Sequence, residues 1–332
     1  MRFGRLLLVF LVLLGAGGIL AWLALTPAPA VEAGPLIVEI PAHEGVVAIA
    51  DRLGRAGVIR SRAAFLGLVG IKGSMRKLKA GEYEIPRDAT SLTVLELLES
   101  GRVRQHVVLH PEGATISELA RLLENERLAS ADDVVKAASS DRLRKSLGIE
   151  GPSLEGYLFP DTYRFVRGMS ADEMLTRMVQ RMREKLTPEV QARARERGLT
   201  VHQLLTLASI IEREAVDPSE QKLIAAVFWN RLHLDMPLQA DPTVQYAVAK
   251  ERGTLTRGDL VSDSPYNTYV HRGLPPGPIA SPGVGSIEAA LDPAPVKFLY
   301  FVARDDRRHY FSTSVAEHNA AVARYRLMRR QL

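Results

Sequence analysis

The feature that most constrains the fold is residues 204–215, an apolar run that ends with two glutamates, Glu212 and Glu214. On a helix, which turns about 100° per residue, the apolar positions cover a wide arc and both glutamates fall inside it. A carboxyl group held against apolar walls has its charged form disfavoured, so its pKa rises toward the range in which it donates a proton near neutral pH. The run therefore predicts a buried helix that carries a candidate acid catalyst.

The residues one helical turn earlier separate the two candidates. Glu212 follows the small residues Ala208 and Ser209, whereas Glu214 follows two isoleucines. Small side chains leave room for a ligand and branched ones fill it, so we expect Glu212 to be the working group. The alternative is that either glutamate caps a buried network or pairs with an arginine.

The amino terminus predicts the compartment of the chain. Residues 6–25 carry no charge and are about long enough to cross a bilayer core of roughly 30 Å as a helix. Arg2 and Arg5 precede this run, and the next lysine or arginine is Arg52. Because positive residues stay on the cytoplasmic side, we expect a single transmembrane helix with its amino terminus in the cytoplasm and the rest of the chain outside the membrane.

This interpretation divides the amino-terminal part into a cytoplasmic tip at residues 1–5, a transmembrane helix at residues 6–25 and a linker at residues 26–35. The alternative is a cleaved signal peptide with the small residues at 28–30 as its cleavage site. The apolar run is longer than the roughly 7 to 15 residues of a signal core, and prolines crowd the site, which favours an uncleaved anchor.

Composition bounds the class of protein. The 332 residues, 46% of them hydrophobic, are enough for about two domains. The chain has no cysteine, which excludes disulfides and thiolate chemistry, and its sequence shows no cluster of carboxylates with histidine, so we expect neither a metal nor a cofactor. The net charge of +5 permits an anionic partner, but the expected location and the lack of a phosphate-binding glycine loop argue against nucleic acid.

Residues 36–105 predict a small α+β domain. The pattern reads as a strand, two helices and a strand, at 36–40, 46–53, 63–69 and 78–86. This order resembles a LysM domain, a module that binds the sugar backbone of peptidoglycan. A generic α+β spacer is the alternative.

The rest of the chain, residues 106–332, reads as a second, mixed α+β domain, so the predicted fold class is α+β throughout. Its loops at 238–246, 264–269 and 273–279 are rich in Tyr, Asn, Thr, Asp and Pro. Rigid turns with these side chains supply the planar apolar faces and directed hydrogen bonds that a sugar ring needs. Ordinary turn chemistry is the alternative, because the same residues form turns anywhere.

Five motifs in order identify a family resemblance. They are Leu158–Tyr163, Ala208–Glu214, Leu238–Val244, Tyr266–Tyr269 and Gly273–Gly277. Together they resemble the endolytic murein transglycosylase family, also called MltG or YceG-like proteins, with Ala240 in a slot that is often Thr or Ser. The resemblance covers essentially the whole chain and implies that residues 106–332 are the catalytic domain.

The resemblance implies a lyase that acts on a polysaccharide. The family cuts the β-1,4 bond between N-acetylmuramic acid and N-acetylglucosamine in nascent peptidoglycan and leaves a 1,6-anhydro end, which terminates strand elongation. Its catalytic glutamate is the first after the Ser-Ile-Ile sequence, which is Glu212 here. The implied partners are glycan strands, the cytoplasmic membrane and peptidoglycan synthases. The candidate cleft residues are Gln239, Asp241, Thr243, Tyr266, Asn267 and Tyr269.

This chemistry needs a single carboxyl group. A hydrolase generally uses two, whereas a lytic transglycosylase uses the C6 hydroxyl of the substrate as nucleophile, so Glu212 alone would act first as acid and then as base. A hydrolytic muramidase is the nearest alternative, with Asp241 as its second carboxylate. The other is a non-catalytic glycan-binding scaffold of wall synthesis.

Overall fold

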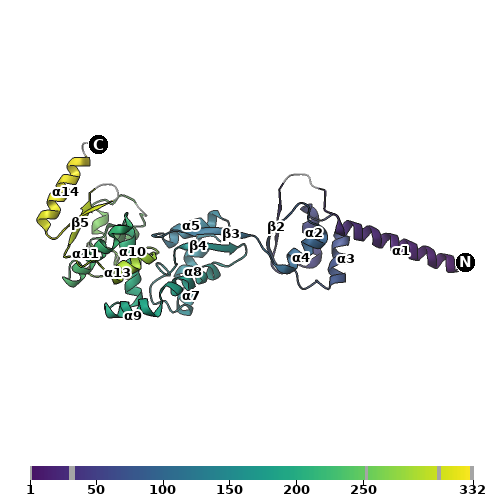
Figure 1. The fold of residues 1–332 in the computed structure, drawn as a ribbon, viewed down its shortest axis with the longest axis horizontal. Coiled ribbons are helices and arrows are strands. Elements are labelled where there is room, and N and C mark those ends of the chain that lie inside the picture. Colours follow the sequence, from purple (N-terminus) through teal and green to yellow (C-terminus); the bar gives the residue numbers. More distant parts are fainter. Residues whose placement is uncertain (1, 30–33, 251–252, 305–307, 330–332) are drawn as a thin grey trace. The chain divides into compact units, whose positions relative to one another are not determined.

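The computed structural model describes residues 2–29, 34–250, 253–304 and 308–329 (Figure 1). These residues form helices and three two-stranded sheets, so the predicted α+β class is confirmed. The chain divides into two compact units. Unit 1 comprises residues 1–106 and 164–168, and unit 2 comprises residues 107–163 and 169–332.

Unit 1 begins with α1 (Arg2–Leu25), which packs against α3 (Arg62–Lys72). Ala24 is buried, and the Arg60 guanidinium lies over the Trp22 ring, 5.0 Å from its centroid. Among the helices of the described residues, none is both long and apolar enough to cross a membrane. The structure therefore does not support the transmembrane span expected at residues 6–25.

The predicted order of strand, helix, helix and strand is confirmed in unit 1. Ser61 caps the start of α3, because its hydroxyl accepts a hydrogen bond from the Ala64 N–H at 3.3 Å. The two strands pair antiparallel, with Val38 opposite Tyr83. The elements are β1 (Leu36–Ile40), α2 (Val46–Arg55), α3, β2 (Gly81–Ile85) and α4 (Ser91–Ser100). The LysM-like domain at residues 36–105 stays a prediction.

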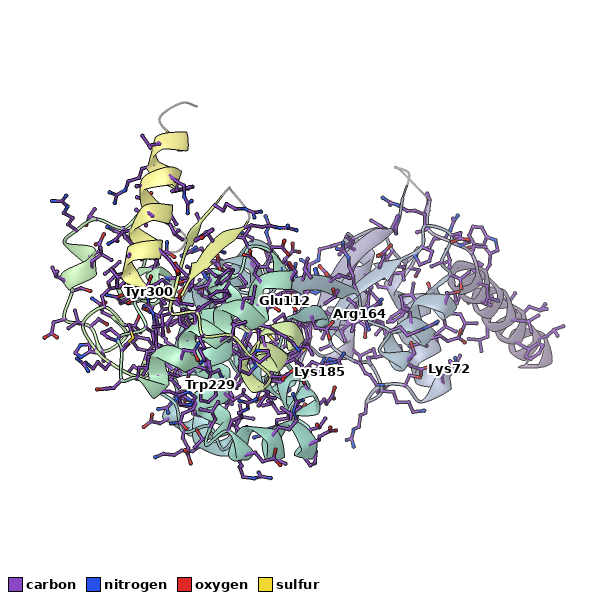
Figure 2. All side chains as sticks on the ribbon, turned by 60° about the vertical axis from the view of Figure 1, so that its left-hand side comes forward. Lys72, Glu112, Arg164, Lys185, Trp229 and Tyr300 are labelled. Carbon is purple, nitrogen blue, oxygen red and sulfur yellow. The ribbon has the colours of Figure 1, made fainter. Side chains whose placement is uncertain are left out.

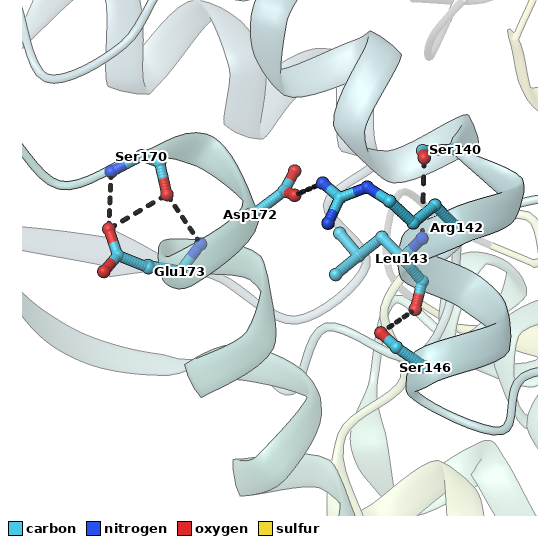
Figure 3. Close-up of polar contacts among 7 residues, drawn as sticks. All are labelled: Ser140, Arg142, Leu143, Ser146, Ser170, Asp172 and Glu173. Carbon is cyan, nitrogen blue, oxygen red and sulfur yellow. Dashed lines mark hydrogen bonds and ion pairs between the residues drawn. The ribbon is translucent and has the colours of Figure 1, made fainter.

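The helical stretch at residues 131–146 is divided in the structure. It ends first as α6 (Ala131–Ser139), and α7 (Asp141–Ser146) then begins where the Ser140 hydroxyl accepts a hydrogen bond from the Leu143 N–H (Figure 3). A serine at a helix start satisfies an N–H that has no partner within the helix, so Ser140 favours the start of a new helix over the continuation of α6.

The helical stretch at residues 171–196 likewise consists of two helices, α8 (Ala171–Lys185) and α9 (Pro188–Glu196). Proline lacks an N–H and suits the first turn of a helix, so Pro188 marks the new start. Figure 3 shows the Ser170–Glu173 capping box that begins α8.

The remaining elements complete unit 2, except that β3 and β4 divide their residues between the two units. Strand β3 pairs with β4, and β5 pairs with β6. These elements are β3 (Gln105–His110), α5 (Ile116–Asn125), β4 (Asp161–Val166), α10 (Val201–Glu214), η1 (Pro218–Glu220), α11 (Gln221–His233), α12 (Asp241–Ala247), η2 (Asp259–Val261), α13 (Val284–Leu291), β5 (Tyr300–Ala303), β6 (His309–Ser312) and α14 (Val315–Arg329).

Helix α10 is the centre of unit 2. Residues 204–211 are all buried, and α10 packs against α11, α12 and α13; Figure 1 shows α10, α11 and α13 together. The Trp229 indole N–H of α11, labelled in Figure 2, donates to the Ala290 carbonyl of α13 at 2.8 Å. The predicted buried helix is therefore confirmed.

The core of unit 1 yields a stability prediction. Phe65 of α3 is fully buried, so we expect Phe65→Ala to destabilise unit 1 by about 3–5 kcal/mol through lost burial and the cavity left behind. Hydrogen exchange at the amides of β1 and β2 measures this change. Ile71→Ala on the same helix is the matched control, because Ile71 is 86% exposed. Equal exchange rates in the two variants would contradict this account of the core.

Candidate active site

Both glutamates lie at the carboxyl end of α10, just after its buried residues, and both side chains are partly exposed. A capping box between Thr200 and Gln203 begins the helix, and Ala215 ends it by turning to an extended conformation. Glu214 is thus the last helical residue. Residues two positions apart on a helix point about 200° away from each other, so Glu212 and Glu214 contact different neighbours.

Glu212 lies in a hydrogen-bond network at the start of α13. Its Oε2 accepts from the Gly283 N–H at 2.9 Å and from the Ser286 hydroxyl at 2.5 Å. The Gln221 side-chain amide donates to the same Ser286 oxygen at 3.0 Å. These contacts match the alternative in which a glutamate caps a buried network.

The space expected beside Glu212 is filled. Ala208 and Ser209 are both buried, and the Ser209 hydroxyl accepts a hydrogen bond from the Ile279 N–H at 3.0 Å. The loop before α13 therefore packs on the small residues of α10, where the sequence predicted room for a ligand. The structure therefore shows no open space at these two residues, and the assignment of Glu212 as the working group stays a prediction.

A second carboxyl group, which the sequence did not indicate, faces Glu212. Glu112, labelled in Figure 2, precedes α5, and burial and then the charge of Glu212 raise its pKa. Gly283 makes room for Glu112, because a Cβ there would overlap the Glu112 carboxyl. The Arg213 guanidinium donates to the Gly113 carbonyl at 3.1 Å and so ties this loop to α10. In the sequence, the only indication that Glu112 lies near Glu212 is its position next to Gly113.

Glu214 has a different environment. Burial raises the pKa of its carboxyl to about 8, with the charge of Asp241 adding to the effect. The charges of Arg231 and Arg213 and a hydrogen bond from the Asp241 backbone N–H oppose this rise. The side chain keeps some exposed surface although its carboxyl is desolvated. Glu214 is thus protonated near neutral pH and can donate a proton, as the sequence predicted for a carboxyl in this arc.

Three predicted cleft residues gather near Glu214. The Tyr269 hydroxyl donates to Asp241 Oδ1 at 2.6 Å, and burial followed by this bond raises the pKa of Tyr269. Gln239 is exposed, and its Oε1 accepts from the buried Arg231 guanidinium at 3.3 Å. Gln239, Asp241 and Tyr269 therefore share one site with Glu214.

Two other predicted cleft residues support the loops from within. Thr243 is fully buried, and its hydroxyl donates to the Ala240 carbonyl at 2.7 Å. Asn267 is fully buried as well, and its amide donates to the carbonyls of Leu260 and Ser262. In this structure both side chains order the loops and present no surface to a ligand.

Tyr266, the sixth predicted cleft residue, lies at the far end of α12 from Glu214. Its ring packs on Tyr246, with centroids 5.0 Å apart. The neighbouring loop is held by His202 at the start of α10, whose Nε2 lies 2.7 Å from the Pro276 carbonyl and whose Nδ1 lies 2.8 Å from the Tyr157 hydroxyl.

Fold and site together define an α+β protein whose candidate active site is a helix-borne carboxyl group among tyrosine, aspartate, glutamine and arginine side chains. The chain belongs to the YceG-like family, whose model matches residues 38–324. The family resemblance drawn from the five motifs is thereby confirmed.

Individual relatives agree with this assignment. The endolytic murein transglycosylase of Bacillus subtilis is 34% identical over 303 residues, covering 87% of this chain and 84% of that protein. The protein of the same name from Streptococcus pneumoniae serotype 2 is 31% identical over 354 residues, covering 96% of this chain and 64% of that protein. A crystal structure of a YceG-like protein of Listeria monocytogenes has a TM-score of 0.61 and 34% identity, and covers 87% of this chain and 99% of that chain.

The raised pKa of Glu214 predicts a pH dependence of stability. The folded chain keeps a proton on this carboxyl up to about pH 8, whereas the ordinary value is 4.5. Between these values the folded state binds one more proton than the unfolded state, so the free energy of unfolding falls as pH rises, by at most about 1.4 kcal/mol per pH unit.

Urea denaturation of wild type and Glu214→Gln across this range measures the effect. The Gln variant lacks the titrating proton, so its stability should fall less steeply with pH than that of wild type. Glu196→Gln, at the exposed end of α9, is the matched control and should keep the wild-type slope. Parallel curves for wild type and Glu214→Gln would contradict the assigned pKa.

Proposed function

We propose that this chain is an endolytic lytic transglycosylase that cleaves peptidoglycan glycan strands. Its family and the names of its relatives from Bacillus and Streptococcus support this function. The feature of the site that carries it is the buried carboxyl group of Glu214, whose raised pKa favours the protonated form and which lies beside three residues predicted to line a sugar cleft. The reaction is that of a lyase, and the bond is the β-1,4 link between N-acetylmuramic acid and N-acetylglucosamine.

We assign the general acid to Glu214 in place of Glu212. The raised pKa of Glu214 favours the protonated form that the leaving oxygen needs, while Glu212 accepts two hydrogen bonds from the start of α13. Glu212 then acts as a positioning residue that fixes the end of α10. The family motif pointed to Glu212, so the two assignments are tested against each other below.

The reaction follows from one carboxyl group. Glu214 donates its proton to the glycosidic oxygen as the bond from that oxygen to C1 breaks. The resulting carboxylate then accepts the proton of the C6 hydroxyl, whose oxygen bonds to C1 and closes the 1,6-anhydro ring. Asp241, held by Tyr269, places negative charge near the site, which favours both the protonated acid and an oxocarbenium-like transition state.

Hydrolysis is the second candidate, because Asp241 offers an exposed carboxylate beside Glu214. A muramidase would consume water and leave a reducing end, heavier by one water than an anhydro end. Mass analysis of the product ends separates the two reactions.

Substitution of the two glutamates tests the assignment. We expect Glu214→Gln to lower the rate of anhydro-end formation on purified glycan strands by about 100- to 10,000-fold, because an amide cannot donate the proton. Glu212→Gln should keep much more activity, since an amide oxygen still accepts hydrogen bonds. The reverse ranking would return the catalytic role to Glu212, and wall function unchanged by both variants would favour the non-catalytic scaffold.

We propose that the chain acts outside the cytoplasmic membrane, with α1 holding it at the membrane. The support is the exposed apolar surface of α1, including Leu11, Leu14 and Trp22, and the location of the proposed substrate. In this arrangement the LysM-like unit contacts glycan, and peptidoglycan synthases are the expected protein partners.

Cell fractionation checks the membrane attachment. We expect the full chain to sediment with membranes and a chain that lacks residues 1–25 to remain in the soluble fraction. Recovery of the full chain in the soluble fraction would contradict the attachment.

A further inference from the structure

A cavity of about 310 Å³ lies in unit 2 between α5, α6 and the end of α12. Glu155, Tyr246 and the hydroxyls of Ser117, Ser139 and Ser153 contribute to its lining. We propose that this cavity is a glycan subsite that binds one N-acetylglucosamine residue of the strand, away from the bond that is cut. The proposal rests on the function proposed above and names a binding site for the same substrate.

The cavity has a preorganised polar wall. Glu155 is only 4% exposed, and both of its carboxylate oxygens accept from the Ile116 N–H, at 3.1 and 3.2 Å. The next residue, Gly156, has a positive φ, and a Cβ there would overlap Pro278. The Glu155 loop therefore cannot move without disturbing the loop that contains Pro278.

Two tyrosines and the Glu155 carboxylate occupy one neighbourhood. Burial first, and then the charge of Glu155, raises the pKa of both Tyr246 and Tyr266. The Tyr246 ring, which lines the cavity, packs on Tyr266. An aromatic face beside a carboxylate and several hydroxyls matches a pyranose ring, which offers an apolar face and a rim of hydrogen-bonding groups.

The cavity and the proposed catalytic site lie at opposite ends of α12. Asp241, the first residue of α12, donates its N–H to Glu214, and Tyr246 is the sixth. Five helical steps of 1.5 Å separate these residues by about 8 Å along the axis. An extended polymer held at Glu214 can therefore reach Tyr246 with a neighbouring sugar.

The chemistry of the cavity selects a neutral, unsubstituted sugar. Among the described residues that line it none is basic, and the Glu155 carboxylate disfavours an anionic group. Its volume is at the lower end of ligand pockets, which suits one ring without a peptide arm. Both arguments favour N-acetylglucosamine over a muramic acid residue that carries its peptide.

Filling the cavity tests the proposal with little risk to the fold. Ser139 is an exposed residue at the end of α6, so a tryptophan there can enter the cavity without disturbing the core. The matched control is Asp132→Trp, an exposed residue of the same helix that does not line the cavity. Both are made in Glu214→Gln, so that binding of chitohexaose, the β-1,4 hexamer of N-acetylglucosamine, is measured by calorimetry without turnover.

We expect Ser139→Trp to weaken chitohexaose binding at least tenfold and Asp132→Trp to leave it unchanged, with circular dichroism confirming the fold of both. Equal binding by both variants and their parent overturns the subsite, as does a parent that fails to bind chitohexaose although the wild type cleaves glycan strands. A wild type that forms no anhydro ends, with binding still lost in Ser139→Trp, contradicts the catalytic function and leaves the glycan subsite standing.

Discussion

The site depends on the desolvation of one carboxyl group at the end of a buried helix. Residues 204–211 of α10 are covered by α11, α12 and α13, and this packing desolvates the Glu214 carboxyl although the side chain keeps some exposed surface. An ionised carboxylate in such surroundings is costly, so the group keeps its proton near neutral pH. The apolar contacts that stabilise unit 2 thus also set the protonation state of the residue assigned as the acid.

One helix supports two carboxyl groups with different roles because it turns between them. Glu212 faces α13 and binds the Gly283 N–H and the Ser286 hydroxyl, whereas Glu214 faces the start of α12. Arg213 reaches the Gly113 carbonyl from between them. The end of α10 is therefore fixed on two sides, and the direction of Glu214 is fixed with it.

Local patterns predicted the elements, whereas contacts distant in sequence shape the candidate site. The pattern of apolar and polar residues located β1, β2, α3 and α10, because these elements depend on neighbours along the chain. The choice between the glutamates depended instead on Ile279, Gly283 and Ser286, which lie 70 to 74 residues after their partners on α10. Asn267 and Thr243 were placed in the cleft because turn-forming side chains and sugar-binding side chains have the same composition, and only burial separates them.

A reaction that uses the substrate's own hydroxyl as nucleophile needs no second carboxylate, but it requires the reacting sugar to be held in a defined geometry. The C6 hydroxyl reaches C1 only in a distorted ring, so the cleft must hold that ring rather than activate water. Buried side chains supply this rigidity here: Asn267 fixes its loop through two carbonyls, and Thr243 fixes the start of α12. The hydrogen-bonded pair of Tyr269 and Asp241 then keeps its position relative to Glu214, which is what the proposed single acid–base group requires in order to act twice on one bound sugar.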